Sequence, residues 1–250
     1  MTIQEIDAEN CSIPLMTDNG MRVVRKVINN AKLRLKDIGR CYEGEINLTF
    51  HKKYIRPSKT GNALLIKGAA IQRYRILEKM KQGEVEYLEQ KRYIRDNGGP
   101  KSKHFREKRI VMQGITGVNE HTRLKMTILD SEAFLGNSAN YILLRSKDYS
   151  YEFILGVLNS KLINWYFKLF STNSNVNGYE IDNIPIPECV IQDEITEIVS
   201  TILSLTENQD YESDPKKQAK VKELELQMDH KVNRTYGLSD EDFLIVKGQG

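Results

Sequence analysis

The feature that most constrains the fold is the order of patterns across residues 108–187. First come short runs rich in β-branched and apolar residues, which predict strands. A longer run follows in which apolar residues recur at three- and four-residue intervals, and this spacing predicts a helix that Asp148 or Ser150 can cap. Strands before a central helix predict an α+β fold, mixed and β-rich. The predicted strands are residues 108–113, 122–129 and 138–144, and the apolar helix positions are Ile154, Val157, Leu158, Leu162, Trp165 and Leu169.

The helix and the segment after it have predicted structural roles. Leu158, Leu162 and Trp165 form a stripe at helical spacing, as packing against a core demands. Pro185 and Pro187 alternate with isoleucine. Because proline has no N–H to donate, we expect these two residues to end strand pairing and to fix an extended exit from the domain.

The segments before residue 108 are short and irregular in pattern. Residues 1–19 are polar without periodicity, which is typical of a loosely docked arm. Glycines and prolines interrupt residues 41–93, so we expect a mostly β region there, with strands at 47–50 and 63–66. Residues 96–103 contain two glycines and a proline among basic residues, and they predict a basic loop.

Helical periodicity returns after residue 190. Residues 191–205 and 219–236 have apolar residues at helical spacing, and Gly237 suits the end of the second helix. Ser239 can cap a further short helix. These C-terminal helices are amphipathic, so each must bury its apolar face against this domain or against another protein.

The sign of the charge changes along the chain. Lys and Arg number 19 against 7 Asp and Glu over residues 51–125, whereas residues 126–250 carry 11 against 20 and residues 1–50 carry 7 against 7. Excess positive charge concentrated in one part of a chain is typical of a phosphate-binding face. Lysines and arginines also solvate ordinary surfaces, and the charge alone leaves both interpretations open.

Basic, amide and aromatic residues interleave within this positive part. Arg, Asn and Gln side chains can hydrogen-bond to base edges, whereas Lys and Arg also reach phosphates. From charge and position we predict base-reading roles for Arg109, Gln113, Asn119, His121 and Arg123. Tyr74 suits a core position as well as a phosphate contact. The predicted phosphate contacts are Arg73, Tyr74, Lys101, Lys103, Arg106, Lys108 and Lys125.

No motif in the chain predicts autonomous catalysis. It has neither a glycine-rich cofactor loop nor the Asn-Pro-Pro-aromatic motif with which adenine methyltransferases hold a flipped base. Glu89-Gln90-Lys91 fits the Glu-x-Lys triplet of many restriction nucleases, but a triplet this short arises by chance and the upstream acidic partner is missing. The histidines and cysteines lack metal-ligand or disulfide spacing, so we expect no metal site and reduced thiols: His51, His104, His121, His230, Cys11, Cys41 and Cys189.

Targeting and membrane signals are not found in the sequence. There is no charged-then-apolar leader and no apolar run near 18 residues. We therefore expect neither secretion nor membrane spanning, and the cytoplasm as the compartment. With 40% apolar residues, a chain of 250 residues can bury a sizeable core.

Several modest motifs occur in an order that identifies a family. They include a Gly-x-x-Ile-x-Arg-Tyr step at 68–74, a Leu-Asn-Ser-Lys-Leu helix at 158–162 and the Ile-Pro-Ile-Pro exit at 184–187. Over about residues 37–245 the chain resembles the target-recognition domain of TaqI-like adenine DNA methyltransferases and type IIG restriction-modification enzymes. The remaining matching segments are 44–47, 109–113 with 127–134, and 224–241.

The resemblance implies a sequence-specific duplex DNA-binding module. It would position an adenine methyltransferase, or a methyltransferase-nuclease, and that partner would supply the S-adenosylmethionine and magnesium chemistry. The implied parts are a polar arm (1–19), a target-recognition domain (20–190) and a C-terminal helical segment (191–250). Two alternatives stay open: a metal-dependent restriction nuclease subunit that uses Glu89 and Lys91, and a basic module that binds RNA or an acidic protein.

Overall fold

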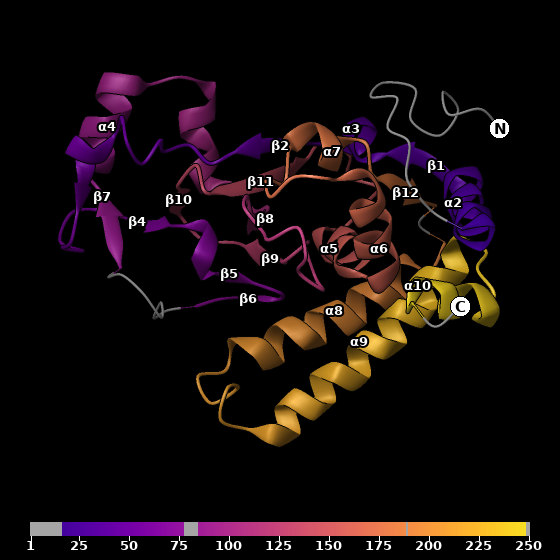
Figure 1. Ribbon diagram of the computed structural model, residues 1–250. Helices are drawn as coiled ribbons and strands as arrows, with labels where there is room; N and C mark the ends of the chain where they lie inside the picture. The colour runs from indigo at the N-terminus through magenta and orange to yellow at the C-terminus, as the bar shows by residue number, and fades with distance from the viewer. Residues whose placement is uncertain (1–16, 78–84, 189, 249–250) are drawn as a thin grey trace.

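The computed structural model describes residues 17–77, 85–188 and 190–248. Most of the predicted polar arm lies outside these residues, but its last two residues belong to helix α2 (Asp18–Asn30). Thr17 caps this helix, because its hydroxyl accepts a hydrogen bond from the N–H of Gly20 at 3.2 Å. In Figure 1 the strands gather on the left and in the centre, and most helices lie to the right and below. The predicted α+β fold is confirmed.

A four-stranded antiparallel sheet forms the centre, in the order β2-β11-β8-β9. Side chains alternate between its two faces, and both faces are buried. Ile110 and Met112 belong to a large core that the sheet shares with the helices. Val111 and Tyr141 belong to a second core on the opposite face of the sheet. Two of the three strands predicted here are confirmed, and the third begins later than predicted, at Met126. The strands are β2 (Gly39–Glu43), β8 (Arg109–Gln113), β9 (Met126–Leu129) and β11 (Ala139–Leu144).

A second four-stranded sheet supports residues 46–67 and 85–106, which we call the basic lobe. Its order is β10-β4-β7-β3, and β10 pairs with β4 in parallel. The predicted strand at 63–66 is β4, but the one predicted at 47–50 is a turn, because the Asn47 side chain accepts hydrogen bonds from two following N–H groups. The elements are η1 (Lys52–Tyr54), β3 (Ile55–Arg56), β4 (Ala63–Ile66), β7 (Glu86–Leu88), α4 (Gln90–Asn97), η3 (Pro100–Arg106) and β10 (Ala133–Leu135).

Two short antiparallel strand pairs connect the sheets to the helices. Strand β12 pairs with β1, so Pro185 and Pro187 do not end strand pairing as predicted. Both prolines lie in an edge strand, where a missing N–H is tolerated. Strands β5 and β6 form a hairpin with a turn at Arg73 and Tyr74. The elements are β1 (Ala31–Arg34), α3 (Leu35–Ile38), η2 (Gly68–Ala70), β5 (Ile71–Gln72), β6 (Arg75–Ile76), α7 (Gly178–Asp182) and β12 (Pro185–Pro187).

The single helix predicted after residue 150 is in fact two helices, α5 (Tyr151–Asn159) and α6 (Lys161–Phe170). Ser150 caps α5 as predicted, and Ser160 interrupts the helical path with extended backbone angles and caps α6. The Asn159 side chain exchanges two hydrogen bonds with the backbone of strand β9, which fixes the break against the central sheet. The predicted core positions Leu158 and Leu162 are buried, and Trp165 is half-buried against the same core.

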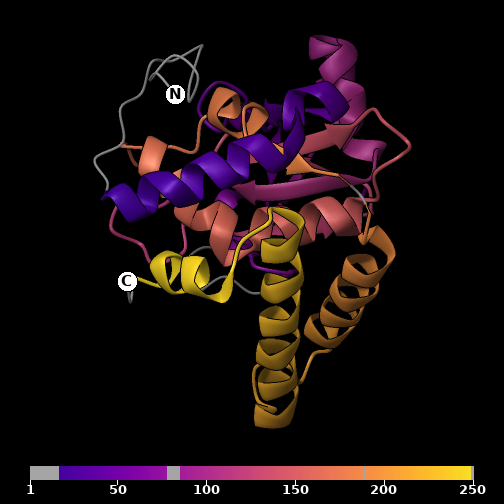
Figure 2. The same ribbon diagram turned by 90° about the vertical axis from the view of Figure 1, so that its right-hand side faces the viewer.

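The C-terminal helices are α8 (Gln192–Glu207), α9 (Pro215–Thr235) and α10 (Asp240–Val246), close to the predicted ranges. Gly237 adopts a positive φ of 65°, as its predicted role at a helix end requires, and Ser239 caps α10. Helices α8 and α9 pack on α5 at Gly156, where an added Cβ would lie 2.8 Å from a methyl group of Ile195. Their far ends extend beyond the rest of the molecule (Figure 2).

Candidate nucleic-acid interface

A buried tyrosine surrounded by cations marks an exposed corner of the basic lobe. The ammonium group of Lys53 lies 5.0 Å from the ring centre of Tyr54, and the guanidinium carbon of Arg92 lies 5.5 Å from it. Cations placed this way are attracted by the electron-rich face of the ring. Lys53 lies on η1 and Arg92 lies on α4, and these two helices carry three further exposed cations. We call the whole set the Tyr54 corner: Lys52, Lys53, Lys91, Arg92 and Arg95.

The local fold explains why these cations face solvent. Tyr93 on α4 is buried and contacts Tyr54 edge-on, with ring centres 5.6 Å apart. Because Tyr93 turns inward, its neighbours Lys91 and Arg95, which are four residues apart, lie on the outer side of the helix and are exposed. An aromatic core therefore holds the Tyr54 corner at the surface.

The positive charge of this corner is not fully compensated. Glu89 pairs with Arg56 and Arg92, both at 3.0 Å, and Asp96 pairs with Arg95 at 2.9 Å. Within the described residues, no carboxylate lies within 4.0 Å of Lys52, Lys53 or Lys91. These cations were not among the predicted phosphate contacts. The Lys-Lys-Tyr sequence and the four-residue spacing on α4 are the signals that could have found them.

The phosphate contacts predicted between residues 101 and 108 divide by exposure. Lys103 is exposed, and Arg106 is exposed above the ring of Phe105 while pairing with Glu132 at 3.5 Å. Lys101 is half-buried and donates to the Gly44 carbonyl at 3.2 Å. Lys108 donates to Glu152 at 2.8 Å. Lys103 and Arg106 thus keep the solvent access that a phosphate contact requires.

Burial corrects the prediction that Arg109 reads bases. Its side chain is fully buried and forms an ion pair with Glu45, which is itself buried. A second guanidinium nitrogen donates to the Ala133 carbonyl at 2.6 Å, and Glu45 accepts from the N–H of Leu135 at 2.9 Å. Strand alternation turns Arg109 to the face of β8 that the second sheet covers, so this residue joins the two sheets.

Burial also corrects the predicted phosphate contacts at Arg73 and Tyr74. Tyr74 is 1% exposed with a φ of 62°, and burial raises the pKa of its hydroxyl. Arg73 pairs with Glu225 on α9 at 2.8 Å and donates to the Asn159 carbonyl at 2.9 Å. The hydroxyl of Thr206 on α8 donates to the Tyr74 carbonyl at 2.6 Å. The turn of the β5–β6 hairpin therefore anchors the C-terminal helices.

Arg123 was also predicted to read bases, and its burial contradicts that prediction. It is 1% exposed, and its guanidinium donates to the carbonyls of Ser171 at 3.0 Å and Asn173 at 2.6 Å. These acceptors belong to the loop 171–177, which lies beside the loop 114–122. The side chain therefore joins two loops inside the molecule and has no access to a DNA groove.

The remaining predicted readers lie at one end of the central sheet. Asn119 and His121 are exposed in the loop 114–122. Gln113 is half-buried, and its amide donates to the Ile71 carbonyl at 2.7 Å, so that amide is already engaged. Lys125, a predicted phosphate contact, is half-buried and pairs with Glu120 at 3.4 Å.

The described residues bring together no group of three or more His, Cys, Asp or Glu side chains suited to a metal ion. Glu89 of the Glu-x-Lys triplet is engaged by two arginines, and Lys91 points to solvent. His104 contacts the Tyr141 hydroxyl at 2.8 Å, and burial lowers the pKa of its imidazole. None of the helices in the described part of the chain is long and apolar enough to cross a membrane.

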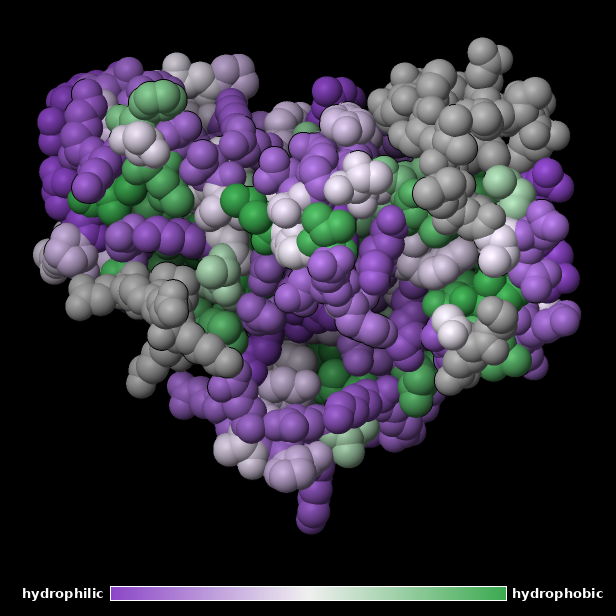
Figure 3. Space-filling model, in the orientation of Figure 1, coloured by the Kyte–Doolittle hydropathy of each residue, from purple (hydrophilic) through white to green (hydrophobic). Residues whose placement is uncertain are grey.

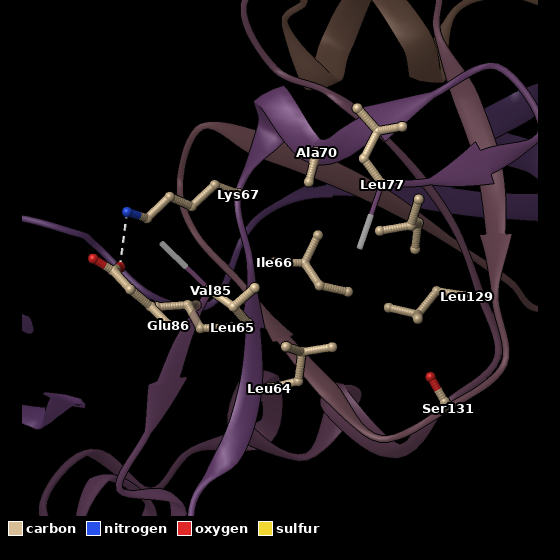
Figure 4. Close-up of a pocket in the computed structure, with 11 residues that line it drawn as sticks. Leu64, Leu65, Ile66, Lys67, Ala70, Leu77, Val85, Glu86, Leu129 and Ser131 are labelled. Carbon is tan, nitrogen blue, oxygen red and sulfur yellow. Dashed lines mark ion pairs between the residues drawn. The ribbon is translucent and has the colours of Figure 1, made fainter. Parts of the chain in front are cut away.

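An apolar cavity of about 240 Å³ lies beside strand β4. Figure 4 shows Leu64, Ile66 and Leu129 around it, with the Lys67–Glu86 ion pair at its edge. The pair spans 2.8 Å and neutralises both charges. Among the described residues the lining is mostly aliphatic.

A family profile and several solved structures match this chain. The profile of the family described as TaqI-like C-terminal specificity domain matches residues 63–186. The chain is similar to the type IIL restriction-modification enzyme MmeI, solved in complex with DNA, with a TM-score of 0.56 and 9% identity over 88% of this chain and 36% of that one. The likeness to MmeI shows the shared fold.

A further similar structure is the HsdS subunit from Thermoanaerobacter tengcongensis, with a TM-score of 0.41 and 11% identity over 88% of this chain and 51% of that one. The chain thus spans about a third of the MmeI chain and about half of the HsdS chain. A comparison with curated proteins gave no match.

Proposed function

We propose, from the premise that residues 63–186 belong to the family of TaqI-like C-terminal specificity domains, that this chain binds duplex DNA and recognises its sequence within a restriction-modification system. The family match is the observation that carries this proposal. The fold shared with MmeI, which was solved in complex with DNA, supports it. No comparison and no cluster among the described residues favours the nuclease alternative.

Phosphate binding is assigned to the exposed cations of the basic lobe. This lobe carries 11 Lys and Arg against 3 Asp and Glu. Within the described residues, Lys52, Lys53 and Lys91 of the Tyr54 corner have no carboxylate within 4.0 Å, and Lys103 and Arg106 add exposed charge from η3. Phosphate contacts orient a protein on the duplex but carry no sequence information, so base recognition must come from other residues.

The catalytic partner in this proposal is an adenine methyltransferase or a methyltransferase-nuclease. Such an enzyme reaches its target base by flipping it out of the duplex, so a separate surface is needed to choose the site. The chain would divide into the arm 1–19, the recognition domain 20–190 and the helical segment 191–250. The acidic α8, which has four Asp and Glu and no Lys or Arg, would face away from DNA and toward the partner.

Selection from a pool of duplexes with a randomised core tests the proposed function. The chain at low salt should enrich a short common sequence, and binding should weaken steeply as salt rises. Single-stranded RNA of the same length serves as the competitor. Equal binding to RNA and duplex DNA, or a pool that stays random, would refute sequence recognition by this chain.

A further inference from the structure

The loops 114–122 and 171–177 form one surface at the end of strand β8. The N–H of Thr116 donates to the Ser174 carbonyl at 2.8 Å, and the N–H of Val176 donates to the Gly114 carbonyl at 2.9 Å. Ile115 and Asn175 form an antiparallel bridge between the loops. The two segments lie far apart in the sequence, so these contacts turn two loops into a single unit.

Arg123 holds this unit together from inside. Besides the Ser171 and Asn173 carbonyls, it reaches the Asn175 carbonyl at 3.4 Å and the Thr116 hydroxyl at 3.3 Å. Its guanidinium carbon lies 5.3 Å from the ring centre of Phe167. No carboxylate of the described residues lies within 4.0 Å of it, and desolvation lowers its pKa.

A buried cation without a counter-ion costs free energy, so carbonyl groups must replace its hydration. Here the carbonyls belong to the loop backbone, and the planar guanidinium fixes several of them at once. Asn164 on α6 adds a second brace, because its side-chain amide donates to the His121 carbonyl at 3.0 Å and its oxygen accepts from the Arg123 N–H at 2.8 Å. The loops are therefore preorganised before any ligand binds.

The outer side of the loop unit is neutral and rich in amides. Its one acidic residue, Glu120, pairs with Lys125, and neither loop contains Lys or Arg. Apolar side chains lie among the amides, since Ile115 is 59% and Val118 is 42% exposed. The other exposed residues are Gly117, Asn119, His121, Thr172, Asn173, Ser174 and Asn175.

This chemistry matches one class of base pair. Asn side chains pair with the N6 and N7 atoms of adenine, apolar side chains contact the thymine methyl group, and guanine is read mainly by Arg or Lys. Strand β8 has five residues and is about 17 Å long, so the loop unit and the basic η3 lie at opposite ends of one strand. A single duplex, with a helical repeat of about 34 Å, can reach both.

We propose that the loop unit reads A·T base pairs in the major groove. Arg123 is the positioning residue that fixes the loops 114–122 and 171–177 relative to each other. The inference rests on the proposed function and names the surface that performs it. Asn119 and Asn175 are the direct readers, one from each loop.

The test uses the full chain and the duplex enriched from the random pool, with a panel of single-base-pair substitutions. Asn119→Ala and Asn175→Ala should each lower the preference for one A·T pair by about 5- to 150-fold, as loss of a good bidentate contact does. The two affected pairs should be neighbours, because the loops form one unit. Asn29→Ala, which removes an exposed amide on α2, is the matched control and should leave every preference unchanged.

Arg123→Lys separates positioning from folding, because it keeps the charge but not the planar fork. We expect preferences at both A·T pairs to fall together, with the salt dependence of binding unchanged and the far-UV circular dichroism spectrum of the wild type. If Arg123→Lys does not fold, the two asparagine variants decide the matter. Unchanged preferences in both, or an effect at a G·C pair, would overturn the inference, whereas failure of the wild-type pool to enrich any sequence would overturn the proposed function itself.

Discussion

The basic lobe and the C-terminal helices differ in the sign of their net charge. The lobe carries 11 Lys and Arg against 3 acidic residues, whereas residues 192–246 carry 13 Asp and Glu against 6 basic ones. In both ribbon views α4 lies near the top and the far ends of α8 and α9 lie at the bottom (Figures 1 and 2). Both areas are largely hydrophilic in Figure 3, so charge rather than hydropathy distinguishes them.

The comparison shows that local charge counts do not by themselves locate a binding surface. The cations of the Tyr54 corner stay exposed because an aromatic core lies beneath them, whereas Arg109 and Arg123 are drawn inward by partners far along the chain. Acidic residues at the other end follow the same division, since Asp242 and Asp229 are buried and Glu197 is exposed. Each charge must be assigned to the interior or the surface before it is assigned a ligand.

The largest expected effect is the loss of folding stability when a buried cation of the positive region is removed, because an exposed cation there does not support the fold in this way. Arg109→Met leaves Glu45 buried without its partner, and breaking such a pair typically destabilises a fold by about 3–5 kcal/mol. Urea unfolding measures the loss. In the double variant Glu45→Met, Arg109→Met, most of the stability should return, because no charge then remains buried. A loss below about 1 kcal/mol in Arg109→Met would mean that this arginine is free to serve the surface.

The second effect tests a buried acid of the C-terminal helices. Burial alone would raise the pKa of Asp242, but hydrogen bonds from Lys26 and from Ser239 outweigh it and lower the pKa to about 2 from an ordinary value of 3.8. A lowered carboxyl pKa stabilises the fold above pH 4, and that stabilisation is lost as the pH falls toward 2. The contribution of this lowered pKa to the free energy of unfolding is about 2 kcal/mol. Chemical denaturation at a series of pH values should show the loss.

Asp242→Asn should remove this acid-dependent step and lower stability at neutral pH, whereas Asp240→Asn, an exposed neighbour on α10, should keep the wild-type profile. Glu225 and Asp229 act in the opposite direction. Burial raises the pKa of both carboxyls, so their protonation favours the folded state as the pH falls. An acid-dependent step of the same size in Asp242→Asn would show that other carboxyls produce it.

How much the sequence could predict follows from the range of the interactions involved. Helix ends at Ser150, Gly237 and Ser239 were predictable because a cap depends on residues within one turn. The break at Ser160 was not, since the contacts that fix it come from strand β9 and from Asp229, whose carboxylate accepts from the N–H of Lys161. Helical spacing alone continues across that residue.

The candidate site shows the same limit. The concentration of positive charge is a property of composition and was predictable, and the exposed Asn119 and His121 fit their predicted place at the surface. In an antiparallel sheet with one face in water, the alternation of Arg109 and Gln113 with Ile110 and Met112 would predict an exposed arginine. A second sheet covers that face here, and Glu45, 64 residues earlier, supplies the partner.

The third effect compares exposed lysines from the two regions directly. Lys53→Ala, Lys91→Ala removes two cations of the Tyr54 corner, and each lost phosphate contact should reduce the log-log salt slope of DNA binding by about 0.9. Lys216→Ala, Lys222→Ala removes two exposed lysines from α9 and keeps the net charge of the first variant. Anisotropy titrations at several salt concentrations measure both. Equal slopes in the two variants would show that total charge matters and that the Tyr54 corner has no special role.

The smallest effect concerns the joint between the two regions. The hydroxyl of Thr206 on α8 donates to the buried Tyr74 carbonyl at 2.6 Å, and Thr206→Val removes this hydrogen bond while nearly preserving volume. We expect a loss of about 1 kcal/mol in the free energy of unfolding, the usual net contribution of such a bond. Thr201→Val is the control, because that exposed hydroxyl donates only within α8, to the Glu197 carbonyl at 2.9 Å.

DNA affinity should stay unchanged in both variants, since the joint supports the helices and not the Tyr54 corner. A weakened affinity in Thr206→Val alone would show that the two regions act as one binding unit.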